Sequence, residues 1–282
     1  MHHLNVDLHC HSTVSDGVLA PDVLAQRAFD HGVNIWALTD HDEIGGIAKA
    51  REAANDLRLR YVTGVEISVT WAGKTIHIVG LDFDENNADL LAGLKRTRSG
   101  RQQRAEEMAQ DLARVGIQGC YAGALKYVGN PDLISRSHFA RYLVEIGICP
   151  DVSSVFKSYL TEGKPGYVPH RWATLTDAVK WIRGAGGIAV VAHPGRYDLS
   201  LIAHDEFLKE FKQLGGEGIE VVTGSHTPDQ YLEYAKVANQ YGLLASRGSD
   251  FHAPDENLPD LGQLPPLTLE LQPVWTCFKS VV

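Results

Sequence analysis

The chain has 282 residues, of which 44% are hydrophobic, and its formal net charge is −9 at pH 7. This length suits one large α/β domain, or a domain with an inserted subdomain, and it is ample for a sizeable core. The acidic balance disfavours binding to long nucleic acids, so local cations or metal ions must hold any phosphate group. No apolar run reaches the length of a membrane span, and the four cysteines form no C-x-x-C pair. We therefore expect a cytoplasmic protein that does not enter a membrane.

Short apolar runs that end in polar residues predict strands buried on both faces. They lie near residues 5–9, 34–39, 60–66, 75–82, 188–192, 218–222 and 243–248. Helical spacing of apolar residues is found at 21–31, 44–59, 174–184, 203–214 and 228–241. This alternation predicts a parallel sheet, open or closed, with its chemistry at the C-terminal ends of the strands.

The alternation lapses between about residues 95 and 172, where the sequence predicts helices at 100–115, 135–147 and 151–160. We interpret this stretch as a mainly helical cap inserted over the catalytic end. The predicted boundaries are 1–96 and 173–282 for the two parts of the barrel-like domain and 97–172 for the cap. The stretch KRTRSGRQQR (95–104) has five positive residues and no acidic one. A solvated helix face is the favoured interpretation of this run, and a nucleic-acid contact is the alternative.

Histidines and carboxylates recur at the predicted strand ends. His9 and His11 occupy positions i and i+2 of a strand, so both can face one site. The other members of the set are Asp16, His41, Glu66, His77, His193, Asp250 and His252. One such histidine alone is more often a core or surface residue, but six of them with three carboxylates are hard to explain without a metal. Mixed nitrogen and oxygen ligands permit Mn, Fe or Zn.

The order of these motifs resembles the PHP (polymerase and histidinol phosphatase) family. The motifs are H-x-H, a following D, T-D-H-D, a strand-end E, an in-strand H, A-H-P and S-D-x-H, within residues 5–85 and 186–255. The resemblance implies an α/β fold, a distorted (β/α)7 barrel that holds two or three divalent ions at its strand ends. Manganese is the ion that the resemblance favours. All nine ligand positions of the fullest family pattern are filled here.

The resemblance also implies how the ligands divide among the ions. One ion would be held by His9, His11, Glu66 and Asp250. A second would be held by Glu66, His77 and His193, with Glu66 bridging. A third ion, if present, would be held by Asp16, His41 and His252.

A narrower resemblance lies in and beside the cap. The segments ISRSHFARYLVEIG (134–147), GKPGYVPHRW (163–172) and AHPGRY (192–197) are similar to a bacterial branch of the family. That branch comprises nucleoside 3′,5′-bisphosphate phosphatases and RNase AM-type 5′→3′ exonucleases. The chain departs from it in reading Ser-Arg-Ser-His at 135–138, where the branch has Gly-Arg-Pro-His or similar, but the arginine and histidine are kept.

Arginine guanidinium groups match phosphate oxygens in shape and charge. We therefore predict that Arg136 and Arg171 clamp a second phosphate with support from Lys164. Arg196 and His170 complete the predicted substrate-binding set. Clustered divalent ions would lower the pKa of bound water and neutralise charge on the phosphoryl oxygens.

The resemblance, together with these residues, implies a phosphohydrolase that removes the 3′-phosphate from nucleoside 3′,5′-bisphosphates such as pAp, and that could also release nucleotides from the 5′ end of short RNA. The donor of a proton to the leaving oxygen stays open among His193, Asp250, His138 and His170. One alternative is a histidinol phosphate phosphatase or another small phosphomonoesterase, against which the long cap with paired arginines weighs. The other is a noncatalytic metal-binding interaction module, against which the complete ligand set weighs. The oligomeric state is left open.

Overall fold

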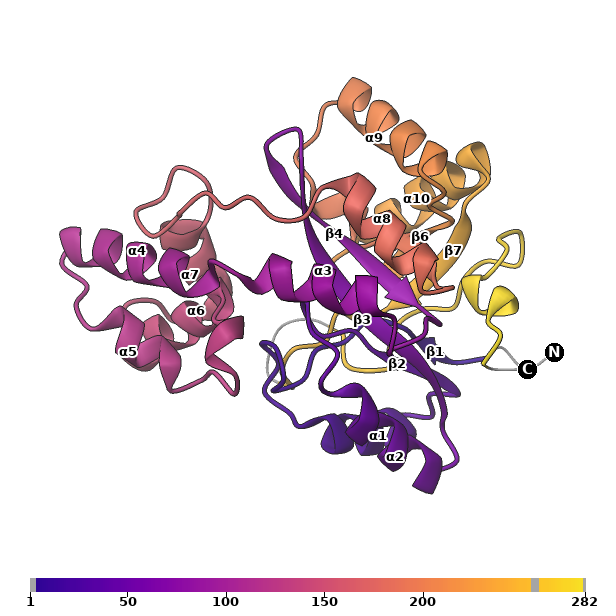
Figure 1. The fold of residues 1–282 in the computed structure, drawn as a ribbon, viewed down its shortest axis with the longest axis horizontal. Helices are drawn as coiled ribbons and strands as arrows, with labels where there is room; N and C mark the ends of the chain where they lie inside the picture. The colour runs from indigo at the N-terminus through magenta and orange to yellow at the C-terminus, as the bar shows by residue number, and fades with distance from the viewer. Residues whose placement is uncertain (1–3, 255–258, 281–282) are drawn as a thin grey trace.

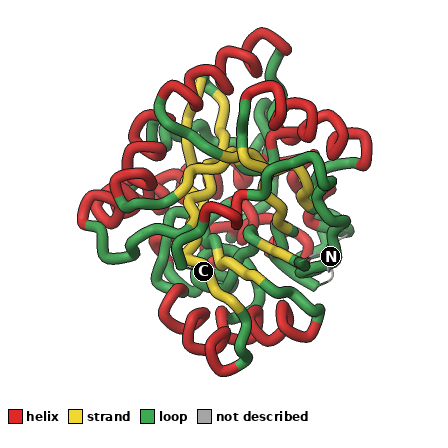
Figure 2. Tube along the Cα trace, turned by 90° about the vertical axis from the view of Figure 1, so that its right-hand side faces the viewer, coloured by secondary structure: helices red, strands yellow, loops and turns green. Residues whose placement is uncertain are grey.

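The computed structural model describes residues 4–254 and 259–280, and its centre is a single seven-stranded sheet with the strands in chain order. The strands are β1 (Val6–Asp7), β2 (Ile35–Leu38), β3 (Arg60–Trp71), β4 (Lys74–Leu81), β5 (Ile188–Val191), β6 (Gly218–Thr223) and β7 (Leu244–Gly248). Figure 2 shows these strands in the middle of the molecule with helices around them. Each of the seven predicted strands overlaps an observed strand.

The sheet is parallel except at β4, which runs antiparallel to both β3 and β5. This corrects the expectation of a parallel sheet. Only Ala72 and Gly73 connect β3 to β4, with φ angles of 46° and 76°, and a two-residue turn of this kind joins antiparallel strands. His77 therefore enters the site from within β4, directly opposite Ser68 of β3.

The first and last strands meet, so the sheet nearly closes into a barrel. The backbone N–H of Leu8 donates to the carbonyl of Arg247 at 3.0 Å, and that of Asp250 donates to the carbonyl of His9 at 2.8 Å. The interior is filled by apolar side chains, among them Val6, Ile35, Val62, Val79 and Val190. The predicted seven-stranded barrel is therefore confirmed, and the segments that follow β1 and β7 lie side by side.

Helices pack against the outside of the barrel (Figure 1). They are α1 (Pro21–Asp30), α2 (Ile47–Asp56), α3 (Ala88–Arg98), α8 (Leu175–Gly184), α9 (Leu201–Gln213) and α10 (Pro228–Tyr241). Local sequence explains their ends, as α10 illustrates: the Thr227 hydroxyl accepts from the N–H of Gln230, Pro228 opens the first turn, and Gly242 ends the helix with a φ of 58°. Among these outer helices of the described ranges, α3 is the one that the sequence does not predict.

The segment between α3 and α8 forms a helical cap that projects to one side of the barrel (Figure 1). Its helices are α4 (Arg101–Arg114), α5 (Cys120–Leu125), α6 (Arg136–Glu145) and α7 (Val152–Val155), followed by a π-helical turn at Phe156–Leu160. The cap has its own apolar core, which includes Met108, Leu112, Phe139 and Leu143. This separate core supports the predicted cap, whose boundaries stay a prediction. Within the described ranges, no helix is long and apolar enough to cross a membrane.

Candidate metal centre

All nine predicted ligands converge at one end of the barrel. They fall into overlapping groups in which the candidate ligand atoms lie within 4.8 Å of one another. The groups are His11, Asp16, His41 and His252; His9, Glu66 and His193; His9, His11 and Asp250; and His41, Glu66 and His77. Two halves of the barrel that are separated by the cap in the sequence thus build a single site.

Glu66 lies at the centre of these groups. Its Oε1 lies 2.9 Å from His77 Nδ1 and 2.9 Å from His193 Nε2, and its Oε2 lies 2.8 Å from His41 Nδ1. Burial alone would raise the pKa of this carboxyl, but the imidazoles of His77 and His41 hold it well below its usual range. The carboxylate is therefore charged, and its two oxygens face different imidazoles, so it would contribute to two of the predicted ion sites.

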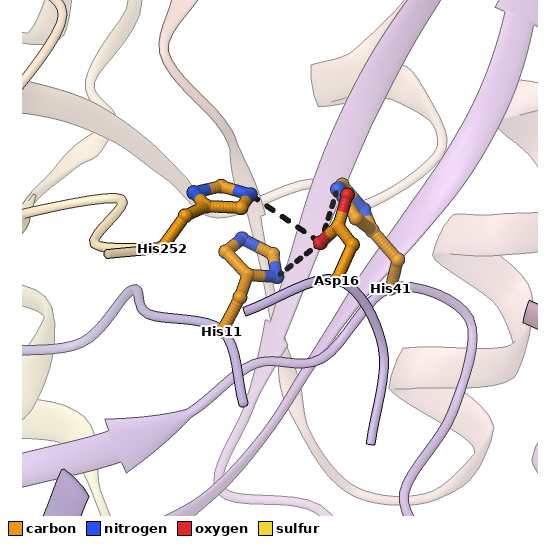
Figure 3. A group of neighbouring side chains, drawn as sticks. All are labelled: His11, Asp16, His41 and His252. Carbon is orange, nitrogen blue, oxygen red and sulfur yellow. Dashed lines mark ion pairs between the residues drawn. The ribbon is translucent and has the colours of Figure 1, made fainter. Parts of the chain in front are cut away.

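Asp16 lies among three imidazoles, as Figure 3 shows. Its Oδ1 lies 3.4 Å from His252 Nε2, 3.8 Å from His41 Nε2 and 3.9 Å from His11 Nδ1. Ligand atoms that each lie about 2 Å from one ion are roughly 3 to 4 Å from one another. The spacing around Asp16 therefore suits a shared cation better than direct hydrogen bonds.

Several buried polar atoms at this centre have no hydrogen-bond partner among the described residues. They are His11 Nδ1, Asp16 Oδ1 and His193 Nδ1, whereas His41 Nδ1 and Glu66 Oε2 face each other at 2.8 Å without the alignment of a hydrogen bond. A buried polar atom without a partner costs about 1–3 kcal/mol, and a bound cation would remove that cost for atoms with a lone pair. Burial lowers the pKa of His11 and of His193 to about 3, so both imidazoles are neutral and can bind a metal. The residues present thus fit divalent ions.

Glu220 of β6 is a buried carboxylate that supports the ligands and that the sequence analysis does not single out. It is 1% exposed. Its Oε1 lies 2.8 Å from His9 Nδ1, and its Oε2 accepts from the backbone N–H of His193 at 2.6 Å. A carboxylate behind a ligating imidazole fixes the orientation of the ring and raises its basicity. The feature of the sequence that points to Glu220 is a single charged residue within the apolar run GIEVVT.

We expect Glu220→Gln to weaken metal binding by about 10- to 100-fold, because the amide is neutral and cannot support His9 and the His193 backbone as a carboxylate does. Calorimetric titration of the metal-free protein with Mn²⁺ measures the change. Glu217→Gln is the matched control, since Glu217 precedes β6 at the other end of the strand and pairs with Arg183. Equal Mn²⁺ affinities of the Glu220 variant and the wild type would contradict the supporting role.

Two further buried carboxylates hold the loops that carry ligands. Asp40 accepts from the backbone N–H of Ser12 at 2.8 Å and from its hydroxyl at 2.7 Å. Asp7 accepts from the backbone N–H of Ser249 at 2.9 Å. The first contact fixes the loop that leads to Asp16, and the second fixes the strand end next to Asp250.

A cavity of about 100 Å³ opens onto the metal ligands. Its remaining lining consists of Ser68, Thr75, Arg101, Arg104, Ser135, Arg136, Ser137, Phe156, Trp172 and Arg196. Arg101 and Arg104 are only 5% and 8% exposed, so this part of KRTRSGRQQR is not the solvated helix face that the sequence favoured. Arg101 pairs with Asp42 of the barrel, and both guanidinium groups lie over the Trp172 ring at 4.6 and 5.2 Å.

The predicted substrate-binding residues separate into two sets. Arg136 and Arg196 line the cavity, and Arg196 Nη1 donates to Asp250 Oδ2 at 3.0 Å. The residues outside this lining are Lys164, His170 and Arg171. The side chains of Lys164 and Arg171 are exposed, whereas His170 packs against Trp172 with ring centroids 4.2 Å apart.

The predicted proton donors also lie in different places. His193 and Asp250 line the cavity among the metal ligands, both with positive φ angles, 26° and 56°, of the kind that often occurs at functional sites. His138 is fully buried and outside the cavity lining. Its Nδ1 accepts from the backbone N–H of Ser135 at 3.0 Å, which closes the capping box of α6. This geometry favours a structural role for His138 over proton donation.

Burial lowers the pKa of His138 from 6.5 to about 4. At a pH between these two values, His138 is protonated in the unfolded chain and neutral in the folded protein. The free energy of unfolding therefore decreases as the pH falls from 7 to 5. We expect His138→Gln, which keeps an acceptor for the capping box, to reduce that loss by about 2 kcal/mol. Urea unfolding of both proteins in metal-free buffer at pH 7 and pH 5 measures the difference. Equal losses in the two proteins would contradict a buried neutral imidazole.

Comparison with known proteins places this geometry in a family. The family described as "PHP domain" matches residues 7–161. A 3′,5′-nucleoside bisphosphate phosphatase of Chromobacterium violaceum is 49% identical over 96% of this chain and 95% of its own length. A 5′-3′ exoribonuclease of Haemophilus influenzae is 42% identical over 96% of this chain and 98% of its own length.

The similarity extends to solved structures. An amidohydrolase from Chromobacterium violaceum, whose structure holds sulfate and no metal, superposes with a TM-score of 0.94 at 48% identity. The match covers 96% of this chain and 95% of the other. The motifs, the nearly closed barrel and these matches agree, and the chain therefore belongs to the PHP-domain family.

Proposed function

We propose that the protein is a metal-dependent phosphohydrolase that removes the 3′-phosphate from nucleoside 3′,5′-bisphosphates such as pAp. The observation that carries the proposal is a cavity whose lining combines the metal ligands of the barrel with arginines of the cap. These two groups of residues suit two separate phosphates of one small substrate. The Chromobacterium violaceum relative, named a 3′,5′-nucleoside bisphosphate phosphatase, supports the same substrate class.

The cap arginines have the properties of an anion site. Burial and the neighbouring guanidinium groups of Arg136 and Arg101 lower the pKa of Arg104 to about 9. The buried Nε of Arg101 has no hydrogen-bond partner among the described residues. Crowded cations in a desolvated site are costly unless an anion joins them. A phosphate here would accept charge-assisted hydrogen bonds and relieve the repulsion.

The chemistry follows from what each side of the cavity holds. When bound to the predicted ligands, divalent ions supply charge neutralisation at the phosphoryl group and lower the pKa of water. The cap arginines hold the 5′-phosphate, and this remote binding positions the 3′-phosphate for attack. Hydrolysis joins a water oxygen to phosphorus and breaks the P–O3′ bond, and O3′ takes up a proton. Of the donors that the sequence left open, His193 and Asp250 line the cavity, and either would have to give up its role as a metal ligand in order to donate.

The alternatives explain less of the site. A histidinol phosphate phosphatase or another small phosphomonoesterase needs no second anion site, so it leaves the placement of Arg104 and Arg136 in the cavity unexplained. A noncatalytic metal-binding module leaves the cavity beside the metal ligands unexplained. Release of nucleotides from RNA 5′ ends is a second candidate activity, which the name of the Haemophilus influenzae relative supports.

The identity and number of the metal ions, the cellular location and the kind of partner are part of the same proposal. We infer that Mn²⁺ is the preferred ion and that two or three ions bind, with Fe or Zn as substitutes. We also keep the expectation of a cytoplasmic protein, which agrees with four cysteines that are all free thiols. The partner is a small phosphate ester or a short RNA 5′ end rather than a long nucleic acid.

A substrate panel tests the proposal. The Mn²⁺-loaded protein is incubated separately with pAp, histidinol phosphate, AMP and a short 5′-phosphorylated RNA, and inorganic phosphate and AMP are quantified. We expect pAp to give AMP and phosphate in equal amounts, and AMP and histidinol phosphate to react much more slowly. Turnover of histidinol phosphate without turnover of pAp would refute the assignment.

A further inference from the structure

A second cavity, of about 280 Å³, adjoins the first. Its lining consists of Ser137, Arg141, Val152, Phe156, Arg196, Ser225, Asp250 and His252. The metal-ligand candidates Asp250 and His252 line both cavities, so these two residues and Arg196 lie where the cavities meet. Arg141, Val152 and Ser225 line only the second cavity. The metal centre is therefore accessible from two sides.

The lining of the second cavity offers a hydroxyl group, apolar surface and positive charge, which are the groups that bind a nucleoside with a phosphate. The buried hydroxyl oxygen of Ser225, in the loop after β6, has no hydrogen-bond partner among the described residues. Val152 and Phe156 of the cap offer apolar surface, and Arg141 and Arg196 offer positive charge. Arg141 also donates to the backbone carbonyl of Asp16, which keeps its guanidinium beside the metal-binding loop.

The chemistry of the ester explains why two cavities would meet at the metals. In pAp the reacting phosphorus carries one organic group, the nucleoside joined through O3′. In a phosphodiester it carries a second group, the next nucleoside joined through O5′. A phosphomonoesterase therefore needs space on one side of the phosphorus, whereas a phosphodiesterase needs space on both sides.

We propose that the second cavity holds the nucleoside joined through O5′ to the reacting phosphorus, so that Arg141, Val152 and Ser225 determine whether diesters are accepted. This inference rests on the proposed function, because it takes the 5′-terminal nucleotide to lie in the first cavity with its 5′-phosphate on the cap arginines. Water adds to phosphorus, the P–O3′ bond breaks, and O3′ takes a proton. The products are a mononucleotide and a shortened chain whose new 5′-phosphate can bind in the next round.

The test compares two substrates that differ only on the side of the second cavity. These are pAp and the 5′-phosphorylated dinucleotide pApA, which yields two molecules of AMP. Val152→Trp and Ser225→Met each fill the second cavity without changing a predicted metal ligand. Val115→Trp and Ser153→Met are the matched controls, because both residues are exposed on the cap and lie outside both cavity linings.

We expect the ratio of kcat/KM for pApA to kcat/KM for pAp to fall about tenfold or more in both cavity variants, and to stay unchanged in the controls. Turnover of pAp by each variant shows that it is folded. An unchanged ratio in both cavity variants would overturn the inference, as would wild-type protein that hydrolyses pAp but not pApA. If wild-type protein hydrolyses neither substrate, the proposed function itself fails, and this inference fails with it.

Discussion

Replacement of Glu66 with glutamine is expected to lower kcat/KM on pAp by about a thousandfold or more. Glu66 faces His77 and His193 with one oxygen and His41 with the other, so the neutral amide would remove the charge that we propose two ions share. Metal ions contribute several kcal/mol to the stabilisation of such transition states, and each 1.36 kcal/mol corresponds to a factor of ten in rate. Initial rates at saturating Mn²⁺ measure the loss.

Two checks separate this effect from damage to the fold. Glu162→Gln serves as the control, because Glu162 is an exposed residue that pairs with Lys74 away from the centre. Thermal unfolding without metal shows whether the Glu66 variant is folded. A folded Glu66→Gln protein that keeps more than about a tenth of the wild-type kcat/KM would be incompatible with a bridging ligand.

Replacement of Arg136 with alanine is expected to lower kcat/KM on pAp by roughly 10- to 100-fold, the range for loss of a hydrogen bond to a charged group. Adenosine 3′-monophosphate lacks the 5′-phosphate, so its kcat/KM is expected to fall much less. The physical reason is that Arg136 lines the first cavity together with Arg101, Arg104 and the metal ligands. Rates on both substrates give the difference directly.

Arg171→Ala is the matched control for this experiment. The sequence predicts that Arg136 and Arg171 together bind a second phosphate. The side chain of Arg171, however, is exposed and lies outside the cavity lining. We therefore expect Arg171→Ala to leave both rates close to those of the wild type. Equal losses on the two substrates in Arg136→Ala would show that this arginine does not recognise the 5′-phosphate.

The convergence of His9 and His11 on one site could be predicted because it is set by local geometry. His9 and His11 follow the alternation of an extended strand, and a polar residue at the C-terminal end of a parallel strand faces the site. Cys10 lies between them and packs on the opposite side, where Trp36 Nε1 donates to its sulfur at 3.2 Å. Short-range periodicity thus predicts which residues face the centre.

Other features depend on contacts between distant segments, and the sequence does not reveal them. The reversal of β4 follows from the two-residue turn at Ala72 and Gly73, which two apolar runs in succession do not indicate. The burial of Arg101 depends on Asp42, which is 59 residues away in the sequence. A basic run on a helix has the same sequence pattern whether it faces water or a cavity. Its burial therefore cannot be predicted without the fold of the cap.

The most direct test of the two-sided site is a crystal structure of the protein with Mn²⁺ and AMP, read by anomalous scattering at the manganese edge. The account predicts anomalous peaks in contact with Glu66 and the surrounding imidazoles. It also predicts the 5′-phosphate of AMP on Arg101, Arg104 and Arg136, with the ribose O3′ directed towards the peaks. Absence of a peak at Glu66, or a 5′-phosphate bound away from these arginines, would contradict it.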